Sequence, residues 1–242
     1  MMRALLFLCA LRISAAYAMW DFYDPAARAT SVVAPPPVYD LRDSKRLFPV
    51  IPQGKCNSCF AMAATTSMEY WAGTRLPVQN IMDCSRSGRN APCKSGGAAK
   101  QMLAWAEKNK IYLVDKKYQE IDMICDRNEE DLFFQVKNFD GRPFVDAERL
   151  RYLVWTYGPV VAPIHIAPGA QPAENGFLNS CDVSHSVQHS VSHSVAVIGY
   201  KATDDTFIVQ DSASGTRYWM AHGSCGLGNN VLYITAAHLA AS

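Results

Sequence analysis

The cysteines constrain this chain more than any other feature of its sequence. The 242 residues include eight cysteines, and Cys9 lies in an apolar leader, so seven follow it. In a secreted protein an odd number indicates an intermolecular bridge or a free thiol with a function. Six of the seven can form three bridges, and spacing alone does not say which one is left over. The seven are Cys56, Cys59, Cys84, Cys93, Cys125, Cys181 and Cys225.

Cys56 and Cys59 form a C-x-x-C pair, a spacing found in redox and zinc sites. A tetrahedral zinc site needs a second such pair, which the sequence lacks. A redox pair is expected near a βαβ pattern, and none is visible. Neither interpretation finds support in the surrounding sequence.

Residues 1–18 are typical of a secretory signal peptide. Arg3 supplies a positive start, Ala4–Leu11 is apolar, and Ala16-Tyr17-Ala18 is a small-x-small cleavage site. The alternatives are a buried N-terminal helix and a mitochondrial presequence, and Arg12 interrupts the apolar stretch. We expect cleavage after this segment, which places the mature chain in an oxidising compartment where disulfides persist.

Charge and hydropathy exclude several classes of partner. The chain has 23 Lys+Arg against 22 Asp+Glu, a net charge of +1, without a basic stripe or a polybasic patch. The longest apolar run, Ala4–Leu11, is too short to span a bilayer. We therefore expect no nucleic-acid partner and no membrane span. We also expect a monomer, located in the secretory pathway as a secreted or lysosome-like protein.

Local patterns predict helices in the front half and strands in the back half. The first helix begins at Phe60, where Ser58 can cap it, and stops at Gly73. Ala98–Asn109 and Ala147–Tyr157 are also helical in pattern. Runs rich in Val, Ile, Phe and Tyr predict strands at Val160–Ile166, Ser194–Tyr200, Thr206–Gln210 and Val231–Thr235. This order indicates an α+β protein in two halves.

Two motifs carry the candidate chemistry: residues 53–60 read QGKCNSCF, and residues 193–200 read HSVAVIGY. On these motifs the chain resembles the papain-like cysteine peptidases, the cathepsin family. The interval from Cys59 to His193 falls in the ~130–150 residue range expected for such enzymes. The resemblance covers most of residues 38–235. Its other landmarks are Tyr39-Asp40-Leu41-Arg42, Gln79, Asp83-Cys84, residues 93–97, Gly158-Pro159-Val160 and Cys225-Gly226-Leu227.

The resemblance implies a papain-like, two-lobed α+β fold. A helical N-terminal lobe (about 45–145) and an antiparallel β-barrel-like C-terminal lobe (about 146–235) would enclose the active-site cleft. Residues 19–37 would be a short pro/linker segment, and 38–242 the peptidase domain. Carried over position by position, the resemblance implies three disulfides and leaves Cys59 unpaired. The pairs are Cys56–Cys93, Cys84–Cys125 and Cys181–Cys225.

The resemblance also implies roles for four side chains. Cys59 would be the nucleophile, at a helix N-terminus that stabilises a thiolate, and His193 the general acid/base. Asp211 would orient the imidazole, and Gln53 would bind the oxyanion together with the Cys59 backbone N–H. The simpler alternatives are an inert or disulfide-bonded Cys59, a solvated strand-end Asp211 and a surface-turn Gln53. Five further residues are predicted near the substrate, namely Gly96, Gly97, Ala98, Ser194 and Asn230.

The chain departs from the family around the residue that orients His193. Asp211 stands where the family usually has Asn, and its charge should raise the His193 pKa. Ala213 is nearest to the position of the usual shielding Trp, and the Gly/Trp-rich loop that follows looks deleted. Phe60 replaces another Trp, and Asn57 replaces a Gly. These changes bear on activity more than on fold.

The residues before His193 form a four-residue HSV repeat with His185 and His189. Histidines four apart share a face of a helix or of a strand, so a metal site is conceivable. A local repeat expansion that forms a loop is the interpretation we favour. We therefore expect no metal and no cofactor.

Two functional hypotheses remain. The first is an active cysteine endopeptidase, with an exopeptidase as a variant. The second is a weakly active or inactive papain-like binding or inhibitory protein. The altered surroundings of Asp211 favour the second, whereas the intact Cys59, His193 and Gln53 argue against it.

Overall fold

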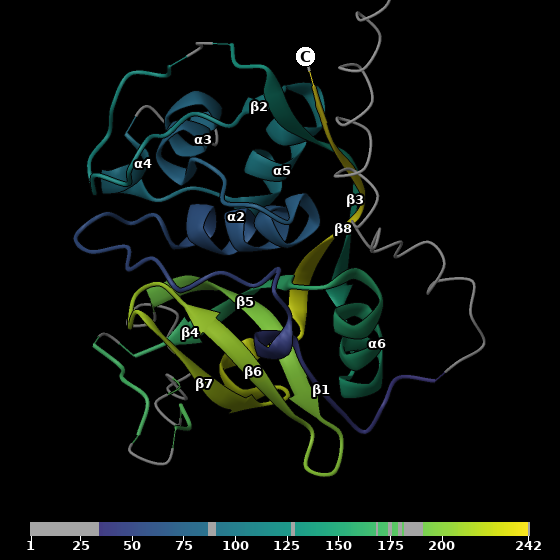
Figure 1. Cartoon of the computed structure of the whole chain (residues 1–242). Coiled ribbons are helices and arrows are strands. Elements are labelled where there is room, and N and C mark those ends of the chain that lie inside the picture. Colours follow the sequence, from purple (N-terminus) through teal and green to yellow (C-terminus); the bar gives the residue numbers. More distant parts are fainter. Residues whose placement is uncertain are drawn as a thin grey trace, which may run out of the picture.

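The computed structural model describes residues 34–86, 91–126, 129–167, 169–173, 176–178, 181 and 191–241. The predicted signal peptide, and with it the proposed cleavage site, lies outside the described residues. So do His185 and His189 of the HSV repeat. Figure 1 shows two groups of elements, one mainly helical and one mainly β.

Helices α2 to α5 make up the helical group. Their bounds are α2 (Cys59–Ala72), α3 (Val78–Ser85), α4 (Pro92–Ser95) and α5 (Ala99–Lys108). Helix α6 (Ala147–Tyr157) and the 3-10 turns η1 (Leu41–Asp43) and η3 (Ser224–Gly226) belong with the β group. None of the helices in the described part of the chain has the length and apolar character to cross a membrane.

The predicted helix after Phe60 is confirmed as α2, with one correction at its start. Gly73 ends the helix in a left-handed conformation (φ 67°), which its lack of a Cβ allows. The Ser58 side chain, however, makes no capping hydrogen bond. Its Oγ lies instead 2.6 Å from the hydroxyl of Tyr118, so the predicted cap was wrong.

The strands form one antiparallel sheet. Their bounds are β1 (Val38–Asp40), β2 (Ile111–Tyr112), β3 (Leu132–Phe144), β4 (Val160–Ile166), β5 (Val191–Lys201), β6 (Thr206–Asp211), β7 (Thr216–Ala221) and β8 (Asn229–Ala241). The order is β2-β3-β8-β4-β5-β6-β7, and β1 pairs with β5. Among the described strands no ladder joins the two edges, so the sheet is open rather than closed into a barrel.

The front half is less helical than predicted, because β3 is a 13-residue strand within it. Strand β3 pairs along its length with β8, and the register shifts between Val136 and Phe139. This irregularity breaks the alternation of buried and exposed residues that marks a strand in a sequence. In Figure 1 the β3–β8 ribbon runs from the β group up along the helical group.

Helix α3 was also missed, and its composition explains why. It has only eight residues, and three of its six buried residues are polar, namely Gln79, Asn80 and Asp83. Their side chains are paired within the protein; for example, Gln79 Nε2 donates to Asp83 Oδ2 at 3.0 Å. Buried polar groups that are satisfied in this way depend on tertiary contacts that sequence periodicity does not carry.

Two buried apolar clusters form the core, and α2 lies where they meet. One cluster joins α6 to strands β4–β7, and the other joins α2, α3 and α5. Trp71 of α2 packs against both clusters, and its Nε1 donates to the Tyr157 carbonyl at 3.0 Å. Trp71 thus anchors the C-terminal end of α2, and the helix also contacts β5 and β6.

Candidate active site

A free thiol stands at the first residue of α2. Of the cysteines in the described residues, Cys59 alone is outside a disulfide, and it is partly buried. The first backbone N–H groups of a helix lack partners within it, and the helix dipole makes this end partly positive. The first turn of α2 carries no acidic side chain. This position therefore favours a thiolate.

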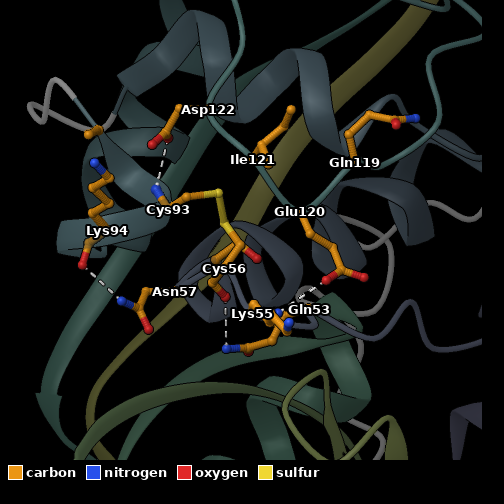
Figure 2. The surroundings of a disulfide bond; sticks show 12 residues. Gln53, Lys55, Cys56, Asn57, Cys93, Lys94, Gln119, Glu120, Ile121 and Asp122 are labelled. Atoms are coloured by element: carbon orange, nitrogen blue, oxygen red, sulfur yellow. Dashed lines mark hydrogen bonds between the residues drawn. A yellow bond between two sulfur atoms is a disulfide. The ribbon is translucent and has the colours of Figure 1, made fainter.

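A disulfide and a set of hydrogen bonds fix the loop that leads into α2 (Figure 2). Cys56 is bonded to Cys93, whose backbone N–H donates to Asp122 Oδ1 at 2.9 Å. The Asn57 side chain donates to the Lys94 carbonyl, also at 2.9 Å. These contacts restrain the backbone just ahead of the free thiol.

The other two disulfides are Cys84–Cys125 and Cys181–Cys225. With Cys56–Cys93 they are the pairs that the family resemblance implies. The C-x-x-C pair is therefore not itself a bridge, because Cys56 is bonded to Cys93 and Cys59 is a free thiol. Among the described residues no cluster of His, Cys, Asp and Glu has the arrangement of a metal site.

An imidazole and a carboxylate meet beside this thiol. His193 is on β5, and Asp211 is the last residue of β6, the strand paired with β5. His193 Nε2 lies 2.6 Å from Asp211 Oδ1, and each residue is only 4% exposed. Asp211 is thus not a solvated strand-end residue. The pair is shielded from water although the sequence lacks the family's usual Trp.

The contacts of His193 raise its pKa. Burial by itself lowers the pKa of the imidazole, but the hydrogen bonds and charges of Asp211 and Cys59 outweigh burial and raise it to about 9. An imidazole with this pKa is protonated at neutral pH. His193 is therefore an imidazolium over most of the physiological range.

The same contacts lower the pKa values of the two acids. Burial raises the pKa of Cys59, but the hydrogen bond and charge of His193 and the N–H groups of Ser194 and Phe60 outweigh it. Burial likewise raises the pKa of Asp211, and its contact with His193 outweighs that effect. Between the lowered pKa values of Cys59 and Asp211 and the His193 pKa of about 9, the arrangement can thus hold a thiolate, an imidazolium and a carboxylate together.

The Gln53 side chain is held by both ends of its amide. Its Oε1 accepts from Ser212 Oγ at 2.8 Å, and its Nε2 donates to the Cys56 carbonyl at 3.1 Å. The Gln53 backbone N–H also donates to the Ser212 carbonyl at 2.9 Å. Because an amide nitrogen carries two hydrogens, one N–H stays available for a further acceptor. Gln53 is therefore an oriented donor and not a free surface-turn residue.

Sequence reasoning missed two residues of this arrangement, Ser212 and Tyr218. Tyr218 is on β7, is 2% exposed, and donates its hydroxyl to Asp211 Oδ2 at 3.0 Å. The Ala213 backbone N–H donates to Asp211 Oδ1 at 2.8 Å. The signal for Tyr218 was the short turn after Asp211, which brings the next strand back alongside it.

The predicted substrate-side residues fall in separate places. Gly96 and Gly97 lie between α4 and α5, and a Cβ at Gly97 would come within 2.6 Å of the Phe60 ring. Ala98 is exposed just before α5. Ser194 follows His193 on β5 and, with Thr66 of α2 and Gln210 of β6, lines a shallow recess. Asn230 stands apart, exposed at the start of β8, whose neighbours in the sheet are β3 and β4.

Comparisons with known proteins agree with this arrangement. Residues 35–228 match the family model for papain family cysteine proteases. Cathepsin J of Mus musculus is 30% identical over 217 residues, which are 84% of this chain and 60% of that protein. Cathepsin L of Sarcophaga peregrina is 29% identical over 215 residues, 84% of this chain and 58% of the relative. The chain thus spans about 60% of the length of these relatives.

Solved structures show the same fold. The structure of digestive procathepsin L 3 of Tenebrio molitor larval midgut has a TM-score of 0.67 at 21% identity, covering 85% of this chain and 72% of that one. A structure from work on the mite allergens Blo t 1 and Der p 1 has a TM-score of 0.67 at 20% identity, covering 86% and 73%. With the matched family model and the paired Cys59 and His193, the conclusion is plain: this chain belongs to the papain family of cysteine proteases.

Proposed function

We propose that this chain is a cysteine endopeptidase that hydrolyses peptide bonds through a thioester on Cys59. The observation that carries the proposal is the buried His193, hydrogen-bonded to Asp211 and paired with the free thiol at the start of α2. Such a pair supplies a nucleophile and a proton donor at neutral pH.

In the proposed acylation step, Cys59 Sγ attacks the peptide carbonyl carbon and the carbonyl π electrons move to oxygen. The oxyanion accepts from the Cys59 backbone N–H and from the free N–H of Gln53 Nε2. His193 then gives its proton to the leaving amine as the C–N bond breaks. A thioester and a neutral imidazole remain.

Deacylation reverses the role of His193. The neutral imidazole takes a proton from water, which attacks the thioester carbonyl, and the thiolate leaves. Asp211 keeps Nε2 occupied throughout, so that the other ring nitrogen serves the reaction. This division of roles requires a fixed imidazole, which the buried hydrogen bond to Asp211 supports.

The proposed substrate is an extended peptide or protein segment. Gly96 and Gly97 would offer backbone groups to it, and Ala98 and Ser194 would border the side-chain pockets, whereas Asn230 lies apart from them at the start of β8. The tight contact of Gly97 with Phe60 explains why a side chain is not accommodated there. We further propose a monomer in the secretory pathway or a lysosome-like compartment, without a cofactor. The proposed domain is 38–242, preceded by a linker and a signal peptide.

A mass-labelling experiment tests this function. The full chain, expressed for secretion, is treated with a peptidyl epoxide beside Cys59→Ala and His193→Ala variants. One adduct in the wild type, none in Cys59→Ala and slow formation in His193→Ala is the expected result. A folded wild type with three disulfides but no adduct would instead favour a binding or inhibitory role.

A further inference from the structure

Tyr218 is a buried titratable side chain that the proposed mechanism does not use. Its hydroxyl donates to the oxygen of Asp211 that does not face His193. Its pKa is raised, because burial and the charge of Asp211 both oppose its ionisation. The phenol therefore keeps its proton and donates a hydrogen bond to Asp211 at any pH at which the site works.

The β6–β7 hairpin explains this contact. Val209 is the cross-strand partner of Tyr218, and Asp211 is the partner of Thr216. Residues two apart on a strand share a face, and diagonal cross-strand pairs lie within reach of an aromatic side chain. Tyr218 thus reaches Asp211 from the same face of the hairpin.

The partners of Asp211 suit a carboxylate rather than an amide. Its Oδ1 accepts from His193 Nε2 and from the Ala213 N–H, and its Oδ2 accepts from Tyr218. All three partners donate, and an ionised carboxylate has acceptor oxygens only. An amide at this position would turn an N–H toward the phenol. Tyr218 therefore matches the acidic residue that this chain carries at position 211.

We propose that Tyr218 is a positioning residue whose hydroxyl holds the second oxygen of Asp211 and takes up part of its negative charge. The first oxygen then aligns His193 without binding the imidazolium too tightly. This inference rests on the proposed peptidase function and deepens it. The Tyr218 hydroxyl would thus offset part of the charge that Asp211 introduces where the family has Asn.

Removing the Tyr218 hydroxyl should raise the pKa of His193. Among the described residues, the titratable groups of this cluster are Cys59 of α2, His193 of β5, Asp211 of β6 and Tyr218 of β7, and Tyr118 interacts with Cys59 from the other side. Without the phenol donor, the Asp211 charge is less shared and holds the imidazolium more strongly. The pKa of His193 then rises above about 9. A simple loss of packing would instead loosen the His193–Asp211 hydrogen bond and lower the pKa of His193.

Alkylation by iodoacetate measures this pKa without a peptide substrate. The Cys59 thiolate forms an S–C bond as iodide leaves, and the anionic reagent reacts fastest while His193 is protonated. The alkylation rate therefore falls at alkaline pH as the imidazolium is lost. This fall is the alkaline limb of the pH profile, and its midpoint reports the pKa of His193. Intact mass confirms one adduct, which the Cys59→Ala variant must lack.

We expect Tyr218→Phe to move the alkaline limb upward by only a fraction of a pH unit, because the lost hydrogen bond acts on His193 indirectly, through Asp211. Tyr233→Phe is the matched control, because Tyr233 is also 2% exposed and donates to Asp140 Oδ2 at 3.0 Å. This control should leave the limb in place. In the D211N background, Tyr218→Phe should move it by much less.

The failures of the two proposals are distinguishable. A wild type without an alkaline limb would overturn the proposed function itself. A wild type with the limb, combined with no shift or a downward shift in Tyr218→Phe, would overturn only the role of Tyr218. An equal shift in the D211N background would do the same.

A second variant covers a Tyr218→Phe protein that does not fold. Incorporation of 3-fluorotyrosine at position 218 keeps the side chain and makes the phenol a stronger donor. The limb should then move to lower pH, because Asp211 binds the imidazolium less strongly. An unchanged limb would contradict the proposal.

Discussion

At the scale of single residues, the charge of Asp211 decides how the buried imidazole behaves. A carboxylate 2.6 Å from Nε2 stabilises the imidazolium, and Cys59 adds to this effect. A neutral amide there would keep the hydrogen bond and lose the charge. The raised pKa of His193 therefore depends on the carboxylate that this chain carries at position 211 together with Cys59.

Asp211→Asn should lower the pKa of His193 from about 9. Removing the negative charge favours the neutral imidazole, so the alkaline limb of iodoacetate alkylation should move to lower pH. Asp140→Asn, which alters another carboxylate bonded to a tyrosine, is the control and should leave the limb unchanged. An upward movement in Asp211→Asn would contradict the assigned charge.

Gln53→Ala should slow peptide hydrolysis without slowing alkylation. Loss of an oxyanion donor lowers kcat by about 10²–10³-fold, whereas alkylation forms no oxyanion. Ser212→Ala keeps the donor and removes only the bond that orients it, so a smaller loss is expected. Equal losses in both reactions would show that Gln53 acts through the local structure alone.

The sequence predicted Cys59, His193, Asp211 and Gln53, because motif spacing carries their positions. It did not predict Tyr218 or Ser212. Their contacts arise from the hairpin and from the loop that approaches it, and these depend on the folded chain. The roles of the four predicted residues stay predictions until the variants are measured.

At the scale of elements, the loop before α2 determines where the thiol stands. The Cys56–Cys93 bridge closes a loop of 37 residues and holds α4 against that segment. The backbone N–H that would bind the oxyanion belongs to Cys59, the first residue of α2. Loss of the bridge should therefore affect both stability and reactivity.

The free energy of unfolding of the double variant Cys56→Ser/Cys93→Ser should be about 3–4 kcal/mol lower, because the unfolded chain gains the entropy that the closed loop had removed. Chemical denaturation measures the change. Cys84→Ser/Cys125→Ser, which opens a loop of 41 residues, is the matched control. This control should lose a similar amount of stability, but its Cys59 should be alkylated faster than Cys59 in the Cys56→Ser/Cys93→Ser variant. Identical reactivity in the two variants would argue against a role for the loop in positioning the thiol.

Sequence patterns located the elements with strong periodicity. The predicted bounds of α6 and β4 agree with the structure, and Asp146 caps α6 by accepting from the Arg149 N–H. The missed elements include α3 and β3. Helix α3 is short and half of its buried residues are polar, and in β3 the register shifts.

At the scale of the whole molecule, the site depends on contacts between the two groups of elements. Gln210 Nε2 donates to Thr66 Oγ1 of α2 at 3.0 Å, and Arg217 donates to the Phe48 carbonyl at 2.6 Å. These contacts join the β6–β7 hairpin to α2 and to the segment before Gln53. The resemblance predicted two lobes, but not that the sheet stays open and sends its β3–β8 ribbon along the helical group.

The most direct test of the central claim is cleavage of internally quenched peptides by the full chain. Products are identified by mass spectrometry, and the wild type is compared with Cys59→Ala and His193→Ala. Cleavage at internal bonds by the wild type, and by neither variant, is the predicted result. A folded wild type with three disulfides and an alkylatable Cys59, yet no cleavage of any peptide, would contradict the account.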